Sequence, residues 1–574
     1  MSFHHSEEYL ETDVLVLGGG LAGCMSAIKA ADRGADVVVF EKAHINRSGN
    51  GCTGLHRIPL IHPDYNYTFE EFARLNVANA AGLCDEDVSR EFARDTLDRV
   101  LDLESYGLTV RKRDGSFLFK PARDISPGEI VIWPPEERVW QNVKPILAKQ
   151  VHKRERVRVV NRIAAIGLLT EEGAAGTRVV GALGMETRTG RFVVCSAKAV
   201  VATSGGSYRV GRHKHTLYAP SRFVECGSPT NAGEGQHMAY RAGADLVNLE
   251  FLELSPAWKD FSHWGCGPIM VGRDLKGDGQ PIVPREGEPI KMARYSQTYT
   301  FGKDTEGLFQ DASVIPGFPE RKGEMEEFYI AEENESTSYG YLLYQRERGE
   351  DYTKAPIEYE WHPPYLHNNQ SGVHMDVNAG TSLEGLYVAG DIMGGGYRQS
   401  GGGAFVFGAR AGANAAAYAR RARKPSVVRE QVDREKGRIL CAADVHPEDG
   451  YSWVELEDKA RQILSEYGPP FTSDPKLERG VSRLERIRER YLPRLYARNP
   501  RELLRASEVR AVFFVVEACL RGGLERKESR SPTVSILYKR QFPEQDDLNW
   551  LKHSVVRNRE GRMKFGTKEV NRLS

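Results

Sequence analysis

The sequence has no CxxC pair. Its eight cysteines stand apart, at positions 24, 52, 84, 195, 226, 266, 441 and 519. Zinc sites and iron–sulfur centres both need clustered thiolates, so we predict no metal site in this chain. Isolated cysteines are typical of reduced thiols in a cytosolic protein, and we therefore expect a cytoplasmic location.

Long apolar runs and a charge surplus are missing too. The chain has no stretch of about 18 apolar residues and no apolar region before its first predicted strand, so we predict neither a membrane span nor a secretory signal. The 79 Lys and Arg residues balance 79 Asp and Glu residues, so we expect no nucleic-acid partner. The basic stretch at 482–497 alternates with Glu and Leu, as a solvated helix face does.

What the chain does have is length and an ordinary globular composition. Its 574 residues are 40% apolar and 28% charged. A single hydrophobic core stops growing well below this length, so two to four domains are expected.

The first 42 residues read as strand, glycine turn, helix and strand. DVLVLGGG (13–20) is an apolar run that ends in glycines, and VVVFEK (37–42) is a second buried strand. The turn fits GxGxxG through Gly18, Gly20 and Gly23, which suit a tight turn, the approach of a pyrophosphate and close helix packing. Glu41 ends the second strand, where a carboxylate can accept hydrogen bonds from a ribose. These features predict a dinucleotide site.

A second strand and glycine turn lie far downstream. GLYVAGD (385–391) ends in Asp391, a carboxylate suited to a ribityl hydroxyl. The glycine loop and alanine-rich helix that follow could turn helical N–H groups toward a negatively charged flavin edge. A fold that uses both segments for one ligand favours FAD over NAD.

At these residues the sequence resembles the flavoprotein superfamily of succinate dehydrogenase, fumarate reductase, L-aspartate oxidase and the α subunit of adenylylsulfate reductase. Further matching stretches are AVVATSGGSY (199–208), SPTNAGEGQHMAYRAGADLVNLEFLE (228–253), GGGAFVFGARAGANAAA (401–417), RKESRSP (526–532) and RQFPEQDDLNWLKH (540–553). The matches keep the family's order over nearly the whole chain. The resemblance implies an α/β fold: a Rossmann-like FAD-binding domain with an inserted α+β capping domain and a C-terminal helical domain.

The resemblance also implies FAD held without a covalent bond. Succinate dehydrogenases and many fumarate reductases carry RSHT after the first βαβ unit, and that histidine bonds to the flavin. Here Gly49 follows Arg47 and Ser48, as in the RSG loop of adenylylsulfate reductase. Carried over residue by residue, the family's cofactor positions fall on Gly18, Gly20, Gly23, Glu41, Lys42, Arg47, Ser48, Thr53, Gly54, Thr203, Glu234, Asp391, Gly403 and Ala404.

Two residues match the family's substrate positions. His367 in HNNQSGV stands where the family has the histidine of an HxTMGG-like turn, and Arg398 in YRQSGGG matches the arginine before its glycine loop. Arginine can clamp a carboxylate or another oxyanion with two hydrogen bonds. We predict Arg398 as the anion ligand and His367 as a substrate ligand or proton donor.

Two departures argue against reduction of fumarate itself. Ser255 in FLELSP replaces the histidine of the family's HP pair, and no RDVVSR-like helix with its proton-shuttle arginine appears between 270 and 330. The segments at 255–268 and 140–148 instead look like the α chain of adenylylsulfate reductase.

We predict five segments: an FAD-binding domain in two parts (1–215 and 370–425), a capping and substrate domain (216–369), a helical domain (426–528) and a C-terminal tail (529–574). The resemblance implies an FAD-dependent oxidoreductase that moves a hydride between the flavin N5 and a small anionic substrate. Because this chain has no cluster ligands, a separate ferredoxin-like iron–sulfur subunit is the expected electron partner. The alternatives are a self-contained oxidase of the L-aspartate oxidase type and an adenylylsulfate reductase α subunit proper.

Overall fold

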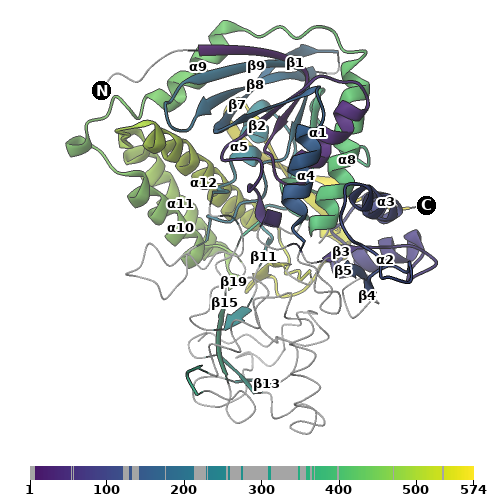
Figure 1. The fold of residues 1–574 in the computed structure, drawn as a ribbon. Coiled ribbons are helices and arrows are strands. Elements are labelled where there is room, and N and C mark those ends of the chain that lie inside the picture. The colour runs from purple at the N-terminus through teal and green to yellow at the C-terminus, as the bar shows by residue number, and fades with distance from the viewer. Residues whose placement is uncertain are drawn as a thin grey trace.

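We describe the protein from a computed structural model (Figure 1). The residues described are 7–52, 55, 57–120, 128–131, 141–174, 176–211, 228, 230–253, 256–258, 273–275, 308–311, 347–349, 357–361, 365–366, 369–396, 400–469, 471–532 and 535–573.

A seven-stranded sheet lies at the centre of the fold. Its order is β6-β2-β1-β9-β8-β7, and β17 also pairs with β9. Pairing is parallel from β6 through β9 and between β17 and β9, whereas β7, β8 and β9 run antiparallel. The strands are β1 (Glu7–Leu17), β2 (Val37–Glu41), β6 (Val157–Asn161), β7 (Ile163–Gly173), β8 (Gly176–Glu186), β9 (Phe192–Ala202) and β17 (Leu386–Val388).

The carboxyl ends of β1, β2, β9 and β17 meet at one edge of this sheet. Leu17 pairs with Phe40 on one side and with Ala202 on the other, and Val388 pairs with Ala202. Residues from the first and second parts of the predicted FAD-binding domain are thereby brought to the same edge. Ligands of open α/β sheets bind in the crevice at such an edge.

Helices α1 (Leu21–Asp32) and α8 (Ser400–Ala419) pack against each other beside this sheet (Figure 1). Small residues let their backbones approach closely: a Cβ at Gly408 would lie 2.7 Å from the Ala22 carbonyl oxygen, and one at Gly412 would lie 2.2 Å from that of Ser26. The Ser26 hydroxyl lies 2.9 Å from the Gly408 carbonyl oxygen. Helix α4 (Val143–His152) packs against α1 as well.

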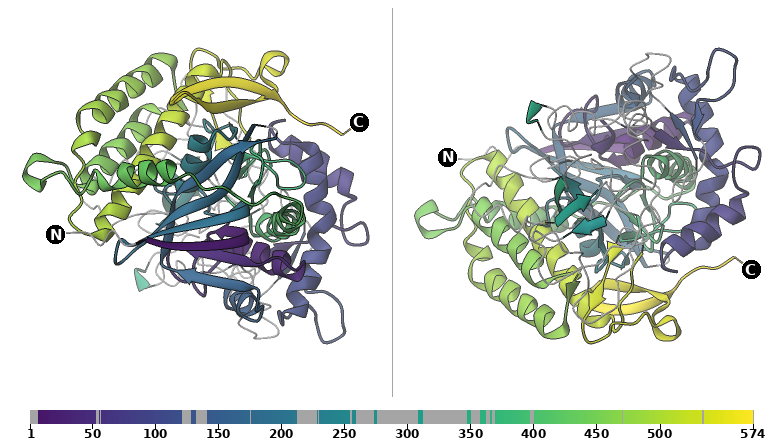
Figure 2. Two further views of the ribbon diagram at one scale, coloured as in Figure 1. Left: turned by 90° about the horizontal axis from the view of Figure 1, so that it is seen from above. Right: turned by 90° about the horizontal axis from the view of Figure 1, so that it is seen from below.

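Two further groups of helices lie on opposite sides of the sheet (Figures 1 and 2). One group contains α9 (Arg429–Leu440), α10 (Trp453–Tyr467), α11 (Asp474–Arg490) and α12 (Pro500–Glu525), together with the short helices η3 (Pro447–Asp449) and η4 (Leu492–Arg494). The other contains α2 (Phe69–Asn79) and α3 (Glu86–Ser105). Helix α5 (Glu234–Ala242) contacts both α12 and the central sheet.

A second sheet joins the C-terminus to the middle of the chain. Its order is β18-β16-β10-β22-β23, with bounds β10 (Leu246–Val247), β16 (Gly372–His374), β18 (Met393–Gly394), β22 (Lys552–Arg559) and β23 (Arg562–Glu569). The hairpin β22–β23 lies between the helical region and α3 (Figure 2). Much of the segment predicted as a C-terminal tail is thus paired secondary structure.

The remaining described elements are short: β3 (Arg57–Pro59), β4 (Phe119–Lys120), β5 (Glu129–Val131), β11 (Leu252–Glu253), β12 (Pro256–Trp258), β13 (Arg273–Leu275), β14 (Leu308–Asp311), β15 (Ile357–Trp361), β19 (Phe471–Thr472), β20 (Ser535–Ile536), β21 (Tyr538–Lys539), η1 (Asn50–Cys52) and α13 (Asp547–Trp550). Within the described part of the chain, no helix is both long and apolar enough to cross a membrane. The six cysteines described there are free thiols, four of them buried.

Candidate FAD and substrate site

The glycine turn between β1 and α1 is shaped by close backbone contacts. Gly18 has φ +108°, and a Cβ there would lie 2.7 Å from the Thr203 carbonyl oxygen. A Cβ at Gly23 would lie 1.8 Å from the Gly18 carbonyl oxygen. Gly20 is different, because a Cβ there would meet only Gly49, at 3.8 Å. Gly18 and Gly23 therefore serve the packing of the turn, and Gly20 keeps its outer side open.

Helix α1 begins at this turn, and its first N–H groups have no partner within the helix. Its N-cap is Gly20, which provides no side-chain hydrogen bond, and its first turn has no acidic residue. Free N–H groups and the positive end of the helix dipole form a site for a phosphate group. Lys144 adds a buried cation, whose Nζ donates to the Gly19 carbonyl oxygen and lies 3.1 Å from the Cys24 sulfur.

Glu41 is fixed beside the same turn. Its carboxylate is buried at the end of β2, and its two oxygens accept hydrogen bonds from the backbone N–H groups of Gly19 at 2.6 Å and Ala43 at 2.7 Å. From the neighbouring strand, the Thr203 hydroxyl lies 2.8 Å from the Gly18 carbonyl oxygen. The predicted residues Glu41 and Thr203 thus both touch the glycine turn.

The loop NRSGNG (46–51) packs against the glycine turn. The Ser48 hydroxyl donates to the Gly19 carbonyl oxygen at 3.1 Å. Gly49 has φ +83°, and a Cβ there would lie 2.9 Å from the Gly20 Cα. A side chain at position 49 would therefore require this loop to move away from the turn. Arg47 is exposed on the same loop.

Asp391 lies where three remote segments meet. The Tyr208 hydroxyl donates to its carboxylate at 3.0 Å, and the Asn50 side-chain amide donates at 3.2 Å. Tyr208 is buried and stacks on Tyr365, with the ring centroids 5.5 Å apart. Burial, the Asp391 carboxylate and Tyr365 together raise the pKa of Tyr208 well above its ordinary value, so the phenol stays protonated and remains a donor.

These residues fit FAD. An open helix N-terminus with a buried lysine beside it suits the pyrophosphate, and the carboxylates of Glu41 and Asp391 suit the hydroxyls of the ribose and the ribityl chain. The Ser204 hydroxyl, at the same edge of the sheet, is buried without a hydrogen-bond partner among the described residues. Gly403 and Ala404 lie buried in the first turn of α8.

Lys42 and Glu234 form a partly buried charge network that reaches the helical region. Lys42 Nζ lies 2.5 Å from Glu234 and 3.1 Å from Glu508 of α12. Arg209 pairs with Glu508 at 2.5 Å and with Glu457 of α10. Burial alone would lower the pKa of Lys42, but the two carboxylates outweigh it and raise that pKa. Both predicted cofactor residues thus have strong protein partners.

The predicted residues Thr53, Gly54, His367 and Arg398 lie outside the described residues, as does Ser255. The chain leading to His367 is described: Ser207 and Leu366 exchange backbone hydrogen bonds of 3.0 and 3.1 Å. That segment therefore passes beside Tyr208. Strand β18 (Met393–Gly394) starts two residues after Asp391, and the bend at 395–396 follows it, just before Arg398.

Comparison with known proteins identifies the family. A model described as an FAD binding domain matches residues 13–406, and one described as fumarate reductase flavoprotein C-term matches residues 457–573. The chain belongs to this FAD-binding family. It is accordingly an FAD-dependent oxidoreductase, and its α/β fold with a C-terminal helical region is that of the flavoprotein subunits it resembles.

The relatives cover nearly the whole chain. A fumarate reductase flavoprotein subunit of Mycobacterium tuberculosis is 26% identical, covering 96% of each chain, and a subunit of the CoM/CoB fumarate reductase of Methanothermobacter marburgensis is 26% identical, covering 97% and 99%. L-aspartate oxidase of Vibrio cholerae is 24% identical, covering 93% and 97%. The structure of adenylylsulfate reductase from Archaeoglobus fulgidus is 22% identical over 100% and 97%, with a TM-score of 0.80, which shows the shared fold.

Sequence reasoning did not single out three residues that lie beside the predicted cofactor residues: Lys144, Asn50 and Tyr208. Asn50 and Tyr208 stand inside the matching stretches NRSGNG and AVVATSGGSY, so their position was a usable signal. Lys144 stands in WQNVKPILA, where nothing in the local pattern separates a buried lysine from a surface one.

Proposed function

We propose that this FAD-dependent oxidoreductase is the flavoprotein subunit of a complex, in which electrons pass between a small anionic substrate, FAD and a separate iron–sulfur subunit. The observation that carries the proposal is the meeting of Glu41 and Asp391, from opposite ends of the FAD-binding region, at one edge of the sheet. Two relatives named as subunits of fumarate reductases support the assignment to a complex. The absence of CxxC pairs from the sequence supports a cluster on another chain.

In this proposal the chain's own residues bind and orient. The N-terminus of α1 and Lys144 hold the pyrophosphate, Glu41 the ribose, and Asp391 the ribityl chain. FAD supplies hydride and single-electron chemistry when bound. Arg398 binds the anionic group of the substrate, and His367 orients the substrate or donates a proton. The close packing of Gly49 on Gly20 supports non-covalent FAD. A cytoplasmic location stays a prediction.

Native purification tests the assignment. We expect the chain to copurify with a ferredoxin-like protein that carries iron and acid-labile sulfide, and we expect acid precipitation to release all the flavin into solution. Mass spectrometry of the copurified chains and absorption spectra before and after precipitation measure both. Flavin retained in the precipitate would contradict the non-covalent site, and a yellow protein free of iron would contradict the complex.

A self-contained oxidase is the second candidate, because L-aspartate oxidase of Vibrio cholerae is 24% identical over almost the whole length. The two candidates differ in how the reduced protein reacts with air. Reoxidation within seconds, with one hydrogen peroxide formed per flavin, would favour the oxidase. Slow reoxidation in air with fast oxidation by the copurified partner or a one-electron dye would favour the complex. An adenylylsulfate reductase α subunit proper predicts that sulfite with AMP reduces the flavin.

A further inference from the structure

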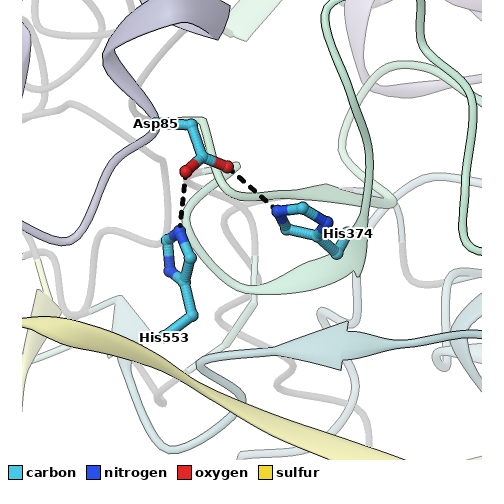
Figure 3. A group of neighbouring side chains, drawn as sticks. All are labelled: Asp85, His374 and His553. Carbon is cyan, nitrogen blue, oxygen red and sulfur yellow. Dashed lines mark hydrogen bonds and ion pairs between the residues drawn. The ribbon is translucent and has the colours of Figure 1, made fainter. Parts of the chain in front are cut away.

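Three buried side chains from distant parts of the chain form one hydrogen-bonded cluster (Figure 3). The Asp85 carboxylate lies 2.9 Å from His374 Nε2 and 3.2 Å from His553 Nε2, and it also accepts from the Asn571 backbone N–H at 2.8 Å. Asp85 and His553 have no exposed surface, and His374 has 6%. We call Asp85, His374 and His553 the Asp–His–His cluster.

The partners of the two Nδ1 atoms determine which ring nitrogens of this cluster carry protons. Lys568 Nζ, which can only donate, lies 3.1 Å from His374 Nδ1. The Asn248 side-chain amide nitrogen lies 2.8 Å from His553 Nδ1 and 3.2 Å from the Gln370 carbonyl oxygen, which fixes the amide as a donor. Both Nδ1 atoms are therefore acceptors, and both rings carry their proton on Nε2, facing Asp85.

With one proton on each ring, the cluster consists of two neutral imidazoles that donate to one carboxylate. Burial lowers the pKa of His553 below its ordinary value despite the nearby Asp85. Burial alone would raise the pKa of Asp85, but hydrogen bonds from His374 and His553 outweigh it and hold that pKa well below its ordinary value. To bind a metal ion, both rings would need an unprotonated Nε2 and a protonated Nδ1 that donates to a neighbouring acceptor. The cluster has the opposite arrangement.

The cluster contacts the segment before Arg398 and includes a residue of the strand after His367. The Asp85 N–H donates to the Gly395 carbonyl oxygen at 2.8 Å, and a Cβ at Gly395 would lie 2.9 Å from the Asp85 carboxylate. His374 belongs to β16, which pairs with β18 through His374 and Gly394. Along the chain, Gly395 precedes Arg398 by three residues, and His374 follows His367 by seven.

We propose that Asp85, His374 and His553 are positioning residues, which hold the turn before Arg398 and the strand after His367 in the arrangement that binds a small anion. The proposal rests on the proposed function, because it assigns the anion site to Arg398 and His367. It adds that the C-terminal hairpin, through His553 and Lys568, helps to position the residues that bind the substrate. None of these side chains is one of the predicted FAD ligands.

Asp85→Asn in the full-length FAD-loaded protein tests the proposal. An amide keeps the size of the carboxylate but offers one acceptor and one donor, so one histidine must turn or change its tautomer. Malonate is titrated while the flavin absorbance is followed, with sulfate as the second probe if malonate leaves the wild-type spectrum unchanged. We expect the dissociation constant of the anion to rise at least tenfold, with FAD content unchanged.

Lys568→Met is a milder second variant, since it removes only the donor to His374 Nδ1. We expect a threefold or greater rise in the dissociation constant, restored by Lys568→Arg. Lys564→Met, at an exposed position of the same strand, should leave it unchanged. A lower melting temperature with anion affinity within twofold of wild type, in both Asp85→Asn and Lys568→Met, would reduce the cluster to a purely structural role. No spectral change of the wild type with either anion would overturn the proposed function, and this assignment with it.

Discussion

Gly49 lets the loop at 46–51 pack directly on the glycine turn. Its backbone is left-handed, and a Cβ added to it would approach the Gly20 Cα to 2.9 Å, so no side chain fits between the loop and the turn. We predict that Gly49→Ala weakens FAD binding and lowers the free energy of unfolding by about 1–3 kcal/mol, since backbone strain and the contact act together.

Gly115→Ala is the matched control, since Gly115 has a similar φ of +86° but no atom near the position of an added Cβ. It carries the backbone strain alone. Thermal unfolding and the dissociation constant of FAD, measured on both variants, separate the two effects. If Gly49→Ala binds FAD as tightly as Gly115→Ala does, the loop does not constrain the cofactor.

At the scale of elements, the contact between α1 and α8 joins the two parts of the FAD-binding region. Gly412 has no space for a Cβ, because the Ser26 carbonyl oxygen would lie 2.2 Å from it. We predict that Gly412→Ala pushes the helices apart and destabilises the protein by about 1–3 kcal/mol despite the better helix propensity of alanine. Denaturant unfolding measures the change.

Gly437→Ala in α9 provides the opposite expectation. No atom lies within 4 Å of the position that a Cβ would take at Gly437, so this variant should gain roughly 0.5–1 kcal/mol from helix propensity alone. Equal effects of Gly412→Ala and Gly437→Ala on stability would show that α1 and α8 adjust freely to an added methyl group.

Helices and strands could be predicted from the sequence where a short local pattern indicates them. The turn GxGxxG between two apolar runs predicted β1, α1 and β2, and GLYVAGD predicted the strand before Asp391. The Asp–His–His cluster was not predictable, because Asp85 and His553 are 468 positions apart. His553 ends the matching stretch RQFPEQDDLNWLKH, but no local pattern pairs it with Asp85. His374 and His553 meet because β10 pairs with both β16 and β22, and Asp85 is held beside them by its N–H bond to the Gly395 carbonyl oxygen. Periodicity describes a residue's face within an element, and it does not describe which remote element will cover that face.

At the scale of the whole molecule, α5 and α12 connect the FAD-binding region to the helices of the C-terminal half. His237 of α5 stacks on Phe514 of α12, with ring centroids 5.2 Å apart. Burial, together with Arg438, Arg241 and Arg510, holds the pKa of His237 well below its ordinary value. The ring is therefore neutral in the folded protein at pH values where the unfolded chain already binds a proton.

Acidification should consequently weaken this connection. As the pH falls below about 6.5, the unfolded state takes up a proton that the folded state does not, so the free energy of unfolding drops. We predict that His237→Phe, which keeps the stacking, reduces the loss of stability between pH 7.5 and 5.5 by about 1 kcal/mol. Urea unfolding of both proteins at the two pH values measures it; an unchanged loss would mean that His237 is protonated in the folded protein.

The position of the hairpin β22–β23 in the chain affects the order in which parts of this enzyme can form during synthesis. The glycine turn of the cofactor site leaves the ribosome more than 500 residues before His553 and Lys568 are made. The strands of the parallel sheet, from β1 to β17, are all made before β22. β10 therefore cannot pair with β22, and the cluster around Asp85 cannot be completed, until β22 has left the ribosome. On the proposal above, a chain that stops before β22 would lack the cluster and would lose its affinity for the substrate anion.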